Sequence, residues 1–97
     1  MLFLAGSKVI DLTPLADLSA LVHLNLDRTD VSDLHPLSKL PNLYELSLHA
    51  TKVSDLRPLE GITSLRSLKI ERSQVTPEEI DRFKLTRPNV AVNPPTN

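Results

Sequence analysis

Hydrophobic residues recur along this chain at a spacing of 22 positions. Two columns of leucine-like residues stand two positions apart in every repeat, and a column of valines follows them. The three columns are Leu2, Leu24, Leu46, Leu68 and Val90; Leu4, Leu26, Leu48, Ile70 and Val92; and Val9, Val31, Val53 and Val75. Self-similarity with a period of about 20 to 29 residues is typical of stacked coils. The pattern therefore predicts a solenoid.

Each coil is expected to hold one short strand and one tight turn. Apolar residues two apart, as at Leu24 and Leu26, indicate a strand with alternate side chains turned inward. The Leu-x-Pro-Leu that follows is too short and too broken by proline for a regular helix, so it predicts a 3₁₀ turn. An aspartate precedes each such turn and can accept hydrogen bonds from its backbone N–H groups. These aspartates are Asp11, Asp33 and Asp55.

A column of hydroxyl residues follows the strands and suggests a second structural role. Its members are Ser7, Thr29, Thr51 and Ser73. We expect these hydroxyls to turn inward or along the turn and to hydrogen-bond backbone groups of neighbouring coils, because buried polar atoms need partners.

The last repeat replaces the proline turn with a helix signal. Thr76 and Glu79 form a potential capping box, and Pro77 stands at the first helical position. We expect Ile80 and Phe83 to face inward. The residues expected to face water are Glu78, Asp81, Arg82 and Lys84. A closing strand at 90–92 and the prolines at 94 and 95, which lack an N–H for further pairing, predict a closed C-terminal end.

Residues 21–37 read Leu-Val-His-Leu-Asn-Leu-Asp-Arg-Thr-Asp-Val-Ser-Asp-Leu-His-Pro-Leu. This segment resembles the 22-residue leucine-rich repeat of bacterial internalins and of phosphatase-1 regulatory subunits, and the likeness extends over residues 2–93. It implies an α/β solenoid with a parallel, concave five-strand sheet, 3₁₀ turns on the convex side and one C-terminal helix. The expected organisation is one leucine-rich-repeat domain over 1–97, with repeats at about 1–20, 21–42, 43–64 and 65–86, a closing strand at 87–93 and a tail at 94–97.

The resemblance also implies a function without catalysis. Leucine-rich repeats of this kind usually bind a protein on the concave sheet, either as a module or as the recognition part of a larger bacterial protein. Any enzyme would need a nucleophile, a base and an oxyanion site that converge in a pocket. The serine and lysine at 47 and 69 do not meet that requirement on a sheet surface, so we expect no enzyme.

Composition limits the classes of partner that the chain is expected to bind. Apolar residues make up 40% of the chain and charged residues 24%, with a formal net charge of -1. Basic residues are scattered, so we expect no nucleic-acid partner. Without cysteine there are no disulfides or thiolate metal sites, and two glycines form no phosphate-binding loop, so we expect no cofactor. The sequence shows neither a signal peptide nor a membrane-spanning segment, which predicts no membrane partner and favours the cytoplasm.

The concave face is predicted from the same period, because side chains that flank the inward pairs point to solvent. The face is polar, of mixed sign and nearly neutral, and it contains arginine but neither tryptophan nor tyrosine. Hot spots favour such arginines, so we expect a modest or charge-steered contact. The predicted partner-binding residues are Asn25, Asp27, Arg28, Glu45, His49, Lys69, Glu71 and Arg72.

Three of these residues form one column, with His49 between Asp27 and Glu71 on strands about 4.8 Å apart. The column allows two interpretations, either a metal site or pH-sensitive contact, or a ladder of surface ion pairs. We favour the ladder because metal ligands need converging directions and supporting hydrogen bonds. We therefore expect no metal.

The N-terminal end lacks the capping signals of the C-terminal end. Its leucines are expected to lie in an end coil with one side uncovered; they are Leu2, Leu4, Leu12, Leu15 and Leu18. Such an edge indicates a fragment of a longer protein, pairing with another copy, or pairing with a partner. The alternative to concave-face binding is thus a structural or self-assembly element that forms a homo-oligomer. Its predicted contact residues are Met1, Leu2, Phe3 and Leu4.

Overall fold

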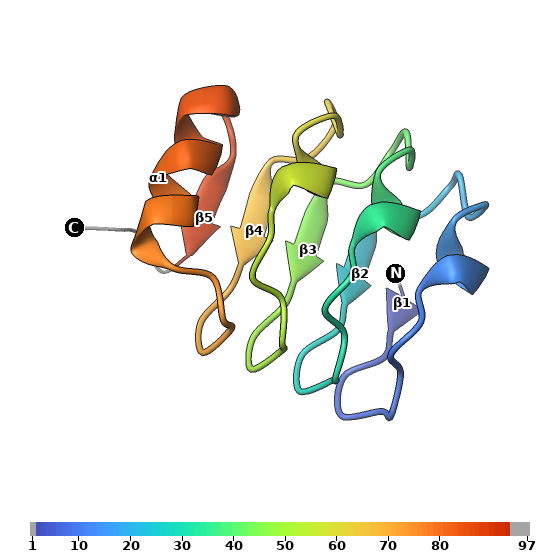
Figure 1. Cartoon of the computed structure of the whole chain (residues 1–97). Coiled ribbons are helices and arrows are strands. Elements are labelled where there is room, and N and C mark those ends of the chain that lie inside the picture. The colour runs from blue at the N-terminus through green and yellow to red at the C-terminus, as the bar shows by residue number, and fades with distance from the viewer. Residues whose placement is uncertain (1, 94–97) are drawn as a thin grey trace.

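Each repeat folds into one coil in the computed structural model, which describes residues 2–93. Each strand pairs in parallel with the next strand along the chain. The strands are β1 (Leu2–Phe3), β2 (His23–Asn25), β3 (Glu45–Ser47), β4 (Ser67–Lys69) and β5 (Ala91–Asn93). Four strands have three residues and β1 has two. Figure 1 shows the strands as one layer and the turns and helix as the other. The predicted parallel-sheet solenoid with 3₁₀ turns and one helix is confirmed.

The three proline turns are 3₁₀ turns, as predicted. They are η1 (Thr13–Leu15), η2 (His35–Leu37) and η3 (Arg57–Leu59). In each, the aspartate two positions before the turn begins accepts a hydrogen bond from the backbone N–H of the first turn residue. The N···O distances are 2.9 Å at Asp11, 3.0 Å at Asp33 and 2.9 Å at Asp55. The structural role of the three aspartates is confirmed.

The core lies between the sheet and the turns. Leu46 and Leu48 of the third repeat are fully buried, while their counterparts Leu2 and Leu4 in the first repeat are only partly buried. Leu18 is 42% exposed, which agrees with an uncovered side of the first coil. The same expectation is wrong for Leu12, which is 1% exposed, because η1 packs beside η2 and the residue joins the continuous core.

The hydroxyl column bonds within each coil. Thr29 Oγ1 donates to the carbonyl of Leu26 at 2.7 Å, and Ser7 and Thr51 repeat the bond three positions back in their own coils. The expected bonds to neighbouring coils are therefore wrong. The reason is a sharp turn at the preceding residue, which has a positive φ of 56° to 74° in every coil. These residues are Gly6, Arg28, Ala50 and Arg72.

The closing strand has a different register from the one predicted. Val92, rather than Val90, lies beside Leu68, so the last step of the ladder is 24 positions long. The extra length has a clear cause, since the ten-residue helix α1 (Pro77–Thr86) replaces a three-residue turn. Val90 is still buried, but it lies outside the column in which the period placed it. The prolines at 94 and 95 lie outside the described residues.

The helix α1 joins the preceding coil through a charged network. Thr76 Oγ1 accepts the Glu79 N–H at 3.2 Å, and Ile80 and Phe83 are buried, as predicted. Glu79 does not complete the capping box. Its Oε2 accepts the backbone N–H of Leu56 at 2.8 Å, and its carboxylate binds Arg82.

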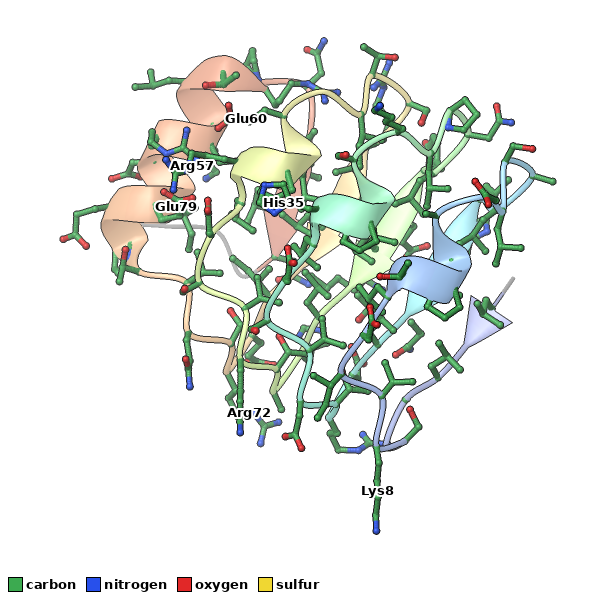
Figure 2. All side chains as sticks on the ribbon, turned by 45° about the vertical axis from the view of Figure 1, so that its right-hand side comes forward. Lys8, His35, Arg57, Glu60, Arg72 and Glu79 are labelled. Atoms are coloured by element: carbon green, nitrogen blue, oxygen red, sulfur yellow. The ribbon has the colours of Figure 1, made fainter. Side chains whose placement is uncertain are left out.

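Arg82 also pairs with Glu60 of the preceding coil, so the prediction that it faces only water is wrong. Figure 2 shows Arg57, Glu60 and Glu79 where α1 meets η3. The Arg82 side chain holds the pKa of Glu79 below its ordinary 4.5, mainly by hydrogen bonding. Arg57 likewise lowers the pKa of Asp55 to about 2.

This network predicts a loss of stability in acid. A lowered pKa means that stabilisation is present above the unfolded-state pKa and is lost as pH falls through the folded-state value. The free energy of unfolding should therefore fall between about pH 5 and pH 2. We expect Glu79→Gln to lower the free energy of unfolding by about 1 kcal/mol at pH 7. The variant should also lose less of this free energy in acid than the parent does, as measured by urea unfolding at pH 7 and pH 3. Glu78→Gln, at an exposed position, is the matched control. If Glu79→Gln lost as much stability in acid as the parent, Glu79 would not be a source of the acid-induced loss.

Candidate functional site on the sheet face

The solvent-facing side of strands β1 to β5, which we call the sheet face, contains one central hollow of about 180 Å³. The hollow extends over β2, β3 and β4. Its lining residues are His23, Leu24, Asn25, Asp27, Glu45, Ser47, His49 and Lys69. Five of the predicted partner-binding residues are thus brought together. The other three, Arg28, Glu71 and Arg72, do not line the hollow.

Asp27 is fixed at the hollow by hydrogen bonds from the next coil. Its Oδ1 atom accepts the Ser47 hydroxyl at 2.5 Å and the His49 backbone N–H at 3.0 Å. The backbone N–H of Asp27 in turn donates to Asn25 Oδ1 at 2.9 Å. These bonds hold the carboxylate in one orientation without the help of a charged neighbour.

Sequence analysis considered Ser47 only as a nucleophile and did not predict its role beside Asp27. It faces solvent by strand alternation, yet it is only 7% exposed, and it donates the shortest hydrogen bond to Asp27. The available signal was its size, because serine is shorter than Asn25 and Lys69, its register partners on the neighbouring strands.

His49 does not act as the centre of an ion ladder. Its Nδ1 accepts the backbone N–H of Glu71 at 2.9 Å, so in the neutral ring the hydrogen is on Nε2. Within residues 2–93 no ion pair joins Asp27, His49 and Glu71, and the favoured ladder is wrong. The physical reason is that the side chains of Asp27 and His49 each accept a backbone N–H from the next coil instead of pairing with each other. The same residues contain no group of three histidine or acidic side chains placed to hold a metal ion.

The other charges at the hollow are already paired. Lys69 Nζ lies 3.0 Å from Glu45 Oε2, and His23 Nε2 lies 3.7 Å from Glu45 Oε1. Tyr44 stands beside this cluster, half exposed, with its ring edge-on to His23 at a centroid distance of 6.3 Å. An exposed tyrosine at the rim adds a residue type that is common in binding hot spots.

Arg28 and Arg72 occupy the tight turns that follow the strands. Both are exposed, and both have the positive φ described above. The Arg28 guanidinium lies over Gly6, where an added Cβ would stand 3.9 Å from Nη2. Figure 2 shows Arg72 projecting away from the ribbon at the turn side of the sheet. The two arginines therefore flank the sheet face at its turn edge.

The predicted self-association edge is described only in part. Leu2 and Leu4 are partly buried, whereas Met1 and the Phe3 side chain lie outside what the structure describes. A shallow hollow of about 480 Å³ opens at this end of the coil stack. Its lining residues are Leu2, Asp17, Leu18, Ser19, Ala20 and Leu21.

Repeat, strand register and turns together define a leucine-rich-repeat protein, and comparisons agree. Internalin C2 of Listeria monocytogenes str. 4b F2365 matches 93% of this chain with a TM-score of 0.82 and 32% identity. Internalin F of the same strain matches 78% of it with a TM-score of 0.69 and 32% identity. A leucine-rich-repeat protein of Leptospira interrogans, at 15% identity, matches 96% of the chain and 37% of its own length with a TM-score of 0.52, which supports the fold alone.

The chain spans 38% of internalin C2 and 23% of internalin F, so it corresponds to less than half of either structure. Comparison with protein-family models and with curated proteins gave no match. The chain is an internalin-like leucine-rich-repeat protein. No helix within residues 2–93 is both long and apolar enough to cross a membrane.

The buried serine gives a prediction for this site. Ser47→Ala removes one of the two donors to Asp27 Oδ1, and we expect it to lower the free energy of unfolding by about 1–2 kcal/mol. Urea unfolding at pH 7 measures the change. Ser32→Ala, at an exposed position, is the control and should stay within about 0.5 kcal/mol of the parent. If the two substitutions had equal effects, Ser47 would not contribute to holding the Asp27 carboxylate in place.

Proposed function

We propose that this chain is a non-catalytic protein-binding module that engages its partner through the sheet face, as the recognition part of a larger protein. The observation that carries the proposal is the fixed arrangement of polar side chains around the central hollow. Asp27, Ser47 and His49 are held by bonds between coils, so little side-chain entropy remains to be lost on binding.

The geometry also supports a non-catalytic role. Ser47 donates to a carboxylate and Lys69 pairs with Glu45, so the candidate nucleophile and the candidate base are each engaged elsewhere. The hollow is smaller than the roughly 300–1,000 Å³ typical of small-molecule sites. A surface of this form suits protrusions of another protein.

The charges of the face favour a steered contact. The strands and the turns that follow them carry three basic and three acidic residues. They are Arg28, Lys69 and Arg72, and Asp27, Glu45 and Glu71. Charges that complement those of a partner increase specificity and association rate more than they increase affinity. Tyr44 at the rim supplies apolar contact area.

The two turn arginines provide the test. We expect Arg28→Ala combined with Arg72→Ala to weaken binding about tenfold for peptides selected from a random display library on the immobilised chain. Thermal stability should change little, because both arginines are exposed and Ala50 already occupies the equivalent turn position in the third coil.

Lys8→Ala combined with Lys39→Ala is the charge-matched control, since both lysines are exposed and neither lines the hollow. Affinities are measured by fluorescence polarisation. If the selected peptides bind the double arginine variant and the parent equally well, the binding surface lies elsewhere.

One observation favours a second candidate function, self-assembly through the first coil. Leu18 is exposed beside the shallow hollow at that end, and exposed apolar surface at an edge promotes association. In this case light scattering over a concentration series should give a mass above the 10.8 kDa chain, and Leu18→Glu should restore the monomer. A monomeric parent at all concentrations would end this alternative.

A further inference from the structure

We infer that the central hollow receives the basic end of an arginine or lysine side chain of the partner protein, with the Asp27 carboxylate as its counter-charge. The inference rests on the proposed function, because it specifies which chemical group of a protein partner enters the sheet face.

The first step of the argument is the state of the carboxylate. Both hydrogen bonds to Asp27 reach Oδ1, from Ser47 and from the His49 backbone. No described residue donates to Oδ2 or forms an ion pair with Asp27. The chain therefore presents a held carboxylate oxygen that can accept a charge-assisted hydrogen bond from outside.

The second step is the balance of charge at the hollow. Glu45 and Lys69 compensate each other across neighbouring strands. The cation nearest to Asp27 in sequence, Arg28, extends over Gly6 of the first coil. Asp27 thus remains as a partly buried negative charge. Solvent and salt weaken the attraction between such a charge and an incoming cation less than they would on an open surface.

The third step concerns what else the incoming group would meet. The Asn25 side chain uses its oxygen for the Asp27 N–H, which leaves its amide hydrogens as donors. His49 has its ring hydrogen on Nε2, because Nδ1 accepts the Glu71 N–H. Donors of this kind suit backbone carbonyl oxygens of a peptide that carries the basic residue. The volume of about 180 Å³ also suits one side chain rather than a cofactor.

The test uses four capped tripeptides of the form Gly-X-Gly, with arginine, lysine, citrulline or glutamate at X. Citrulline matches arginine in shape without its charge. Binding is followed by NMR on the ¹⁵N-labelled chain, where the His49 amide reports directly because its N–H bonds to the Asp27 carboxylate. We expect saturable shifts of His49 with arginine or lysine, and affinities at least about tenfold lower for citrulline and glutamate.

Asp27→Asn and Asp30→Asn form a matched pair of variants. An asparagine at 27 keeps an oxygen for Ser47 and His49 but loses the charge, so binding of the basic peptides should weaken about tenfold. Asp30→Asn makes the same charge change at an exposed position, where the nearest cation is Lys52 at 3.8 Å, and should bind like the parent. If Asp27→Asn does not fold, the comparison of arginine with citrulline on the parent chain decides the question.

The inference is overturned if citrulline binds as tightly as arginine, if Asp27→Asn binds as tightly as the parent, or if the shifted amides lie away from β2 to β4. Its failure can be told apart from failure of the proposed function. If library-selected peptides occupy the sheet face but bind Asp27→Asn as tightly as the parent, only the basic-residue inference is overturned. Selected peptides that bind away from the sheet face would overturn the proposed function itself.

Discussion

Stacking of the inward leucines between neighbouring coils is the interaction on which the rest of this structure depends. Leu24, Leu46 and Leu68 stand directly beside one another, and each coil buries its apolar side only against the next. Because the core fixes the register, it also fixes the outward residues between the leucines. The distances around the central hollow are therefore set by packing on the opposite side of the sheet, and a rigid polar surface results from an apolar constraint.

Much of this fold could be predicted from local signals that repeat. Residues two apart gave the strands, the proline turns gave the 3₁₀ segments, and aspartates such as Asp33 bonded as expected because their partners lie only two positions away. The closing register escaped prediction because a ten-residue helix consumes more chain than a three-residue turn. The bond from Leu56 to Glu79 escaped it because two acceptable N–H donors compete for one carboxylate, and only the packed structure chooses between them.

The candidate site shows the same division between what is local and what is not. Strand alternation predicted which side chains share a face, and it brought Asn25, Asp27 and His49 to one hollow. The prediction that neighbouring charges form ion pairs was wrong for Asp27 and His49. Asp27 accepts hydrogen bonds from a hydroxyl and a backbone N–H, and His49 accepts one from a backbone N–H. Burial of Ser47 depends on the lengths of its neighbours, which a list of charges does not contain.

The longer final step of the ladder has a consequence for how such a chain can grow. Between β1 and β4 every step is 22 positions, so a duplicated unit inserted there would pair with both neighbours and keep its leucines inward. The unit that carries α1 has a different length and a charged junction with the coil before it, so it cannot be exchanged for the others. Gene duplication between β1 and β4 would therefore lengthen the stack in whole steps, and each added unit would widen the sheet face while leaving α1 and its contacts intact.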